Sequence, residues 1–262
     1  MSKFAVAVVL IALGVVGVQG WTLQRDIDAL KLLKEEVQWR DPQWAGVVAN
    51  WQGGGEWGKD DPCGLGWKGN WLGIECRDQE HLPKETPRVV TNIHLTDRGL
   101  SGPSPLAMVL LKDLKEIDFD GNRITGPLNP FLGCMENLEE VDYANNDLHG
   151  TIPTEWRFLN KLQELELETN SKLYGCVPQE MPPTTTICKK ENGNAVCELM
   201  GVITFETKVS GICKEKPNIG KRCADYNMVR QFINNGMKYE EMYKSHGDSS
   251  GGQQPGYELH QG

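Results

Sequence analysis

Apolar and polar residues alternate in a pattern that repeats four times between Val90 and Pro178. Aligned on the last glycine of each unit, the segments read VTNIHLTDRGLSG, LKEIDFDGNRITG, LEEVDYANNDLHG and LQELELETNSKLYG. These glycines are Gly102, Gly126, Gly150 and Gly175, so the units are spaced by 24, 24 and 25 residues. Agreement among four registers indicates a repeat architecture rather than a chance run of alternating leucines.

Three columns of apolar residues recur at fixed places in the units and alternate with polar positions. This alternation predicts one short, half-buried strand in each unit. Because a single unit cannot bury its apolar face alone, the units are expected to stack, with their strands side by side in a parallel sheet. The columns are Val90, Leu114, Leu138 and Leu162; Ile93, Ile117, Val141 and Leu165; and Leu95, Phe119, Tyr143 and Leu167.

An asparagine follows the third apolar column in three of the four units, at Asn122, Asn146 and Asn170, whereas Arg98 takes this place in the first. A buried asparagine at the end of each strand is expected to turn the chain inward. Its amide can satisfy backbone groups that the turn would otherwise leave without water or a partner.

The block before the repeats, residues 21–88, has a different pattern. Apolar residues at Leu23, Ile27, Leu30, Leu33 and Val37 have helical spacing, which predicts an amphipathic helix with Thr22 as its cap. Several tryptophans follow, and packing is the expected role for most of them. Trp57 and Trp67 are the candidates for an exposed, sugar-stacking tryptophan.

These two regions together resemble the plant-type leucine-rich-repeat family. The units fit L-x-x-L-x-L-x-x-N-x-L followed by x-L-x-G-x-I-P, most clearly at Ile152-Pro153 and Val177-Pro178. Asn50-Trp51 and the segment from Cys63 to Cys76 resemble the N-terminal cap of the same family, although the gap between the cysteines is longer than usual. The resemblance implies a disulfide between Cys63 and Cys76.

The resemblance also implies the fold: an α/β solenoid, a right-handed superhelix with a parallel concave sheet and about four repeats. We expect an N-terminal cap over residues 21–88, repeats over 89–180 and a cysteine-rich C-terminal cap over 181–225. Residues 226–262 are expected to hold a short helix and a disordered polar tail, with Met228, Val229, Phe232 and Met237 as the apolar residues of the helix.

Residues 1–20 are typical of a secretory signal peptide, because a positive start is followed by an apolar run and small residues. No other stretch is apolar enough for a membrane span. Eight cysteines behind such a leader indicate disulfides rather than a zinc site. Beyond Cys63 and Cys76 the pairing stays open. For Cys134, which lies apart from the others, a buried thiol is the alternative to a disulfide.

The sequence contains no motif that predicts catalysis. It has no G-x-S-x-G, no H-E-x-x-H, no phosphate-binding glycine loop and no histidines at metal-ligand spacing. An enzyme is therefore not expected, and no cofactor is implied. The formal net charge of −9 argues against nucleic acid and anionic membrane surfaces as partners.

The polar positions of the predicted strands, which should face outward on the concave side, are strongly acidic. They are Glu116, Asp118 and Asp120; Glu140 and Asp142; and Glu164, Glu166 and Glu168. Like charges on neighbouring strands repel and lower stability. One hypothesis is therefore a site for a basic protein or peptide, or for a divalent cation such as calcium. The alternative is a solvated acidic face on an acidic protein.

The sequence thus predicts a secreted module that recognises a macromolecule through its concave sheet, in a signalling or co-receptor-like role. This is similar to the ectodomains of plant receptor kinases. The resemblance also covers polygalacturonase-inhibitor-like proteins, so a secreted inhibitor of a cell-wall-degrading hydrolase is a second hypothesis. Such inhibitors usually have more repeats. A structural surface or wall protein is a third, because the segments at Gly175 and Thr151 are similar to surface antigens of some protists.

Overall fold

A computed structural model describes residues 22–52, 61–64, 71–77, 83, 86–182, 186–191, 194–199, 207–213, 221 and 223–236. The expected signal peptide, the candidate tryptophans Trp57 and Trp67, Met237 and the polar tail lie outside the described residues.

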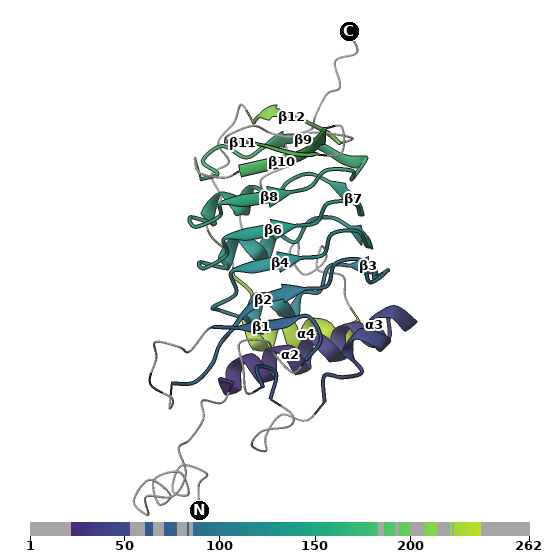
Figure 1. Cartoon of the computed structure of the whole chain (residues 1–262), viewed down its shortest axis with the longest axis vertical. Coiled ribbons are helices and arrows are strands. Elements are labelled where there is room, and N and C mark those ends of the chain that lie inside the picture. Colours follow the sequence, from purple (N-terminus) through teal and green to yellow (C-terminus); the bar gives the residue numbers. More distant parts are fainter. Residues whose placement is uncertain are drawn as a thin grey trace, which may run out of the picture.

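The helices and strands follow the chain in a regular order (Figure 1). The α-helices are α2 (Gln24–Val37), α3 (Pro42–Val48) and α4 (Tyr226–Asn235), and the 3-10 helices are η1 (Ala107–Leu110), η2 (Pro130–Cys134) and η3 (Thr154–Phe158). The strands are β1 (Ile74–Cys76), β2 (Val90–His94), β3 (Ser101–Pro103), β4 (Glu116–Asp118), β5 (Arg123–Gly126), β6 (Glu140–Asp142), β7 (Asp147–Gly150), β8 (Glu164–Glu166), β9 (Lys172–Val177), β10 (Thr186–Glu191), β11 (Asn194–Leu199) and β12 (Lys208–Ile212).

The strands form two sheets, and each repeat contributes one strand to each of them. The larger sheet, hereafter the concave sheet, has the order β1-β2-β4-β6-β8-β10-β11, and the second sheet has the order β12-β9-β7-β5-β3. From β2 to β10 the concave sheet is parallel. The expected parallel solenoid is confirmed, and the figure shows its strands stacked as successive layers above the N-terminal helices.

The predicted asparagine ladder joins each unit to the one before it. Asn146 Nδ2 donates to the carbonyl of Tyr143 at 3.1 Å and to that of Phe119 in the preceding unit at 2.8 Å, and its Oδ1 accepts from Ile124 N at 2.8 Å. Asn122 and Asn170 repeat this arrangement. Each side chain therefore satisfies backbone groups of two units at the place where the chain leaves the concave sheet.

The glycine of each repeat lies in the second sheet and has a positive φ: 79° at Gly102, 86° at Gly126, 88° at Gly150 and 93° at Gly175. Residues with a Cβ rarely adopt this conformation, which explains why glycine marks the end of every unit. The x-L-x-G-x-I-P part of the repeat thus forms a strand of its own, which the alternation pattern did not predict.

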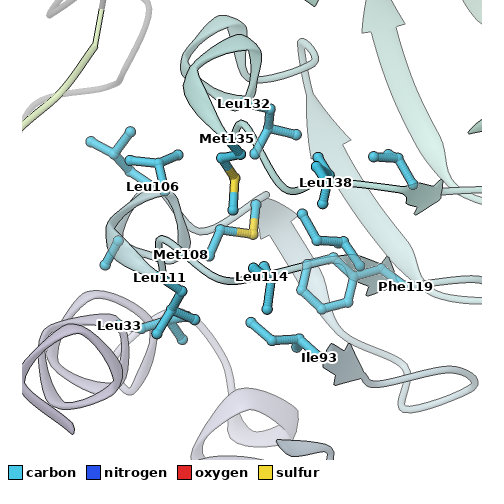
Figure 2. Packing of buried hydrophobic residues seen from close by; sticks show 14 of the residues in the cluster. Leu33, Ile93, Leu106, Met108, Leu111, Leu114, Phe119, Leu132, Met135 and Leu138 are labelled. Atoms are coloured by element: carbon cyan, nitrogen blue, oxygen red, sulfur yellow. The ribbon is translucent and has the colours of Figure 1, made fainter. Parts of the chain in front are cut away.

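The three apolar columns form one core between the sheets and the 3-10 helices, and all twelve side chains are at most 5% exposed. Figure 2 shows Leu33 of α2 beside Leu111, and Met108 and Met135 pointing toward one another between successive units. The core is therefore continuous from the N-terminal helix into the repeats, as stacking of units requires.

Helix α2 covers the first repeat with the predicted stripe, but Thr22 does not cap it. Leu23 is the N-cap residue and provides no side-chain hydrogen bond. Thr22 instead bonds to the Cys63 segment. Its amide donates to Asp61 Oδ2 at 2.9 Å, and its hydroxyl donates to the same carboxylate and accepts from Cys63 N at 3.2 Å. The expected cap is wrong because Thr22 ties the start of α2 to the Cys63 segment.

Strand β1 protects the edge of the concave sheet by pairing antiparallel with β2. A disulfide joins Cys63 to Cys76, the pair that the resemblance implied, with an S–S distance of 1.94 Å. Trp51 and Trp71 stack on one another with ring centroids 5.8 Å apart. At the other end, β10 pairs with β8, β11 pairs antiparallel with β10, and Cys176–Cys213 joins β9 to the residue after β12.

Cys134 is not a free thiol, which decides between the two alternatives that the sequence left open. It forms a disulfide with Cys223, 89 residues later in the chain. The chain then continues into α4, which Asp225 caps by accepting from Met228 N at 2.8 Å. This short helix returns to the N-terminal end and lies beside α2 (Figure 1), with Val229 and Phe232 buried.

Candidate functional site

The acidic positions of the concave sheet form two columns that run in register across three strands. Glu116, Glu140 and Glu164 are direct neighbours in β4, β6 and β8, and Asp118, Asp142 and Glu166 form the second column. Buried Ile117, Val141 and Leu165 lie between the columns and face the core. The alternation therefore places six partly exposed carboxylates on one surface, hereafter the acidic face.

Polar side chains of the first repeat satisfy the carboxylates at one edge of this face. His94 Nε2 lies 2.9 Å from Glu116, and Asn92 Nδ2 donates to the same carboxylate. Thr96 Oγ1 donates to Asp118 at 2.6 Å. The hydrogen bond to Glu116 raises the pKa of His94, because it stabilises the protonated imidazole.

The carboxylates further along the face have raised pKa values. Burial raises the pKa of Glu140 to about 7, helped by repulsion from Glu116 and Glu164. Burial likewise raises the pKa of Asp142 to about 7, although a hydrogen bond from Ala144 N opposes the rise. The pKa of Glu166 rises to about 8 through burial and the neighbouring charges of Asp142, Glu168 and Glu164. Near neutral pH, the carboxyl groups of Glu140, Asp142 and Glu166 are therefore partly protonated.

Asp120 and Glu168, which lie two residues beyond the ends of β4 and β8, were also expected to face outward, but only one of them does. Asp120 is partly exposed and accepts from Asn145 Nδ2 at 2.7 Å. Ala144 and Glu168, however, are only 1% and 3% exposed. The reason is that the chain has already begun to turn toward the asparagine ladder at this point, so the alternation of the strand no longer applies.

The structure also adds a residue that the sequence argument did not include. Glu75 of β1 brings its carboxylate to 3.6 Å from His94 Nδ1, so the imidazole lies between Glu75 and Glu116. No repeat pattern could have found this neighbour, because β1 precedes the repeats and runs antiparallel to them. The acidic face therefore extends from β1 to β8.

Chemically, this arrangement presents hydrogen-bond acceptors and negative charge. Within the described ranges, no group of three or more histidine, cysteine, aspartate or glutamate side chains is placed to hold a metal ion. Among the same residues, no helix has the length and apolar composition needed to cross a membrane.

Comparisons with known proteins bear on the repeats. The family model described as "Leucine Rich Repeat" matches residues 113–135. Among solved structures, the BIR2 ectodomain from Arabidopsis thaliana is similar at 20% identity and a TM-score of 0.48, covering 72% of this chain and 94% of that one. The receptor kinase SOBIR1 ectodomain, also from Arabidopsis thaliana, is similar at 15% identity and a TM-score of 0.43, covering 74% and 99%.

A third similar structure is the ectodomain of the Arabidopsis receptor kinase HAESA in complex with an IDA peptide hormone ligand. Its identity is 24% and its TM-score 0.47, with 63% of this chain and 26% of that chain covered. The family match covers one of the four units, and the other units share its spacing of 24 or 25 residues, its parallel strands and its asparagine ladder. The repeats of this chain are therefore similar to leucine-rich repeats and resemble those of the plant type.

Proposed function

We propose that this protein is an extracellular, non-catalytic recognition module whose acidic face binds a basic segment of a protein or peptide. The observation that carries the proposal is the register of like charges across β4, β6 and β8. Carboxylates placed directly opposite one another lower stability unless a cation lies near them. A lysine- or arginine-rich partner would relieve this repulsion and form charge-assisted hydrogen bonds.

The proposed extracellular location rests on the chain's covalent chemistry. Three disulfides tie the described residues together. Disulfides persist in oxidising compartments and are rare in the cytosol. The predicted signal peptide, residues 1–20, fits the same location.

The proposal predicts that affinity for a basic peptide rises with pH. A synthetic peptide of alternating lysine and glycine can be titrated into the protein by calorimetry between pH 6 and pH 8.5. Glu140, Asp142 and Glu166, with pKa values near 7, 7 and 8, lose their remaining protons over this interval. The face therefore becomes more negative, and binding should tighten by about tenfold at low salt and weaken as salt is added.

A matched pair of triple variants separates the acidic face from the overall charge. Glu140→Gln, Asp142→Asn and Glu166→Gln together should abolish the pH-dependent binding. Asp28→Asn, Glu136→Gln and Asp147→Asn remove the same number of carboxylates on α2, after η2 and on β7, away from the face. Equal binding by both triples would show that only the net charge of the molecule attracts the peptide, and the proposal would be wrong.

A further inference from the structure

A groove of about 740 Å³ lies where three distant segments of the chain meet. Its walls are the turn after α2, strands β3 to β9 of the second sheet and the end of α4. Trp39 and Arg40 contribute from the first, Thr125, Asp147, His149 and Lys172 from the second, and Gly236 from the third. A volume of this size is typical of small-molecule sites.

An ion pair between the buried carboxylate of Glu36 and the partly buried guanidinium of Arg40 holds one wall of the groove. The carboxylate of Glu36 accepts from Leu106 N at 2.8 Å and Ala107 N at 2.9 Å, and it pairs with Arg40 at 2.6 Å. The Arg40 guanidinium also donates to the carbonyl of Pro103 in β3. These contacts fix the turn after α2 to the second sheet, so this wall exists before any ligand arrives.

The charges around the groove are already compensated. Glu36 pairs with Arg40, Asp147 with Lys172 at 2.7 Å, and Glu35 with Arg230. A charged ligand would have to compete with these pairs or leave one of their members without a partner. The electrostatics of the groove therefore favour a neutral ligand that can accept and donate hydrogen bonds, in contrast to the acidic face.

Trp39 gives this groove an apolar platform. Of the tryptophans in the described part of the chain, Trp44, Trp51, Trp71 and Trp156 are at most 2% exposed, whereas Trp39 is 85% exposed. Its position follows from the sequence, because it comes two residues after the stripe of α2 ends at Val37. A large exposed ring beside hydroxyl, carboxylate and imidazole groups suits a ligand with one apolar face and polar edges.

We propose that this groove binds a short neutral oligosaccharide. One sugar ring stacks with its apolar face on the indole of Trp39, and its hydroxyl groups hydrogen-bond with Thr125 of β5 and with Asp147 and His149 of β7. The site is separate from the acidic face and does not depend on its proposed function, so either can fail without the other.

Calorimetric titration with cellotetraose, xylotetraose and maltotetraose tests the proposal, with tetragalacturonate as the charged counterpart. At least one neutral tetrasaccharide should bind at millimolar concentration or below. Trp39→Ala should weaken that binding by about tenfold, the effect of losing one aromatic contact. Tyr174→Ala is the matched control, because Tyr174 is 49% exposed on β9 and does not line the groove.

Both variants remove an exposed ring, so both should keep the melting temperature of the parent protein, and a loss of binding then reports the site itself. Thr125→Val, which keeps the shape and removes the hydroxyl, should weaken binding severalfold. Three results would each overturn the proposal: none of the neutral tetrasaccharides binds, binding survives Trp39→Ala, or tetragalacturonate binds more tightly and depends on Lys172.

Discussion

The two sheets of this solenoid are built from the same four units, yet they treat charge in opposite ways. On the concave sheet, carboxylates lie opposite carboxylates in two columns. On the second sheet, Asp147 of β7 meets Lys172 of β9 at 2.7 Å, and His149 is the in-register neighbour of Lys172. One surface thus carries repulsion between its strands, whereas the other carries compensated pairs.

This difference separates what the fold requires from what it tolerates. Apolar columns, asparagines and glycines recur in every unit because the solenoid needs them. The polar positions are free of that demand, so a neutral or alternating pattern would serve the concave sheet better than like charges do. The like charges of the acidic face are therefore not required by the fold, and this is the basis of the proposed function.

The largest expected loss of stability follows from replacing an asparagine of the ladder, because these side chains lie where the chain passes from one sheet to the other. Asn146 lies where the chain leaves β6 for β7. Asn146→Leu would remove the hydrogen bond to the amide of Ile124 and one of the two asparagine hydrogen bonds to each of the carbonyls of Phe119 and Tyr143. Unfolding free energy should fall by about 2–4 kcal/mol. Chemical denaturation measures it, and Asn160→Ala, an exposed asparagine, should change it by less than about 0.5 kcal/mol.

The second prediction is a gain in stability, on removal of carboxylates from the acidic face. Because Glu140, Asp142 and Glu166 have folded-state pKa values above those of the unfolded chain, the folded state holds the extra protons. Their contribution to stability is present at low pH and is lost as pH rises through about 7 to 8. Replacing the three by their amides should therefore stabilise the protein at pH 8 by about 1–2 kcal/mol.

Thermal melts at pH 5 and pH 8 check this prediction. The parent protein should lose stability between the two values through these groups, and the triple variant should lose less. A triple variant that melts at a lower temperature than the parent at pH 8 would mean that the carboxylates stabilise the fold, and the contrast between the sheets would disappear.

The smallest change in stability is expected when an ion pair of the second sheet is broken. Lys172→Met breaks the pair with Asp147, but the two side chains are 58% and 50% exposed. Exposed pairs of this kind contribute at most a few tenths of a kcal/mol, and the melting temperature should barely change. A drop as large as that of Asn146→Leu would show that the second sheet depends on its ion pairs.

Sequence reasoning reached the features that repeat at a fixed spacing. The strand columns, the concave sheet and the roles of Asn122, Asn146 and Asn170 follow from local alternation and stacking of neighbouring units. The acidic positions within the strands were found for the same reason. Glu168 was expected to face outward and is buried instead, because the alternation ends where the chain starts to turn.

Contacts between distant segments could not be predicted in this way. The partner of Cys134 lies 89 residues away, and Glu35 pairs with Arg230 across most of the chain. The Trp39 groove depends on the same return of α4 to α2, together with the turn that follows α2. No period in the sequence reports such contacts, although the position of Trp39 outside the apolar stripe was a visible signal.

The return of the chain at Cys223 also limits how this protein can evolve. A solenoid usually gains or loses units with little penalty, because each unit touches only its neighbours. Here Cys213 is bonded to Cys176 in the fourth unit and Cys223 to Cys134 in the second, so the nine residues between Cys213 and Cys223 must reach from the fourth unit to the second. Each unit inserted between them would lengthen that path by about 4.8 Å. The short connection thus limits how many units can lie between the two disulfides while the C-terminal helix still packs against α2.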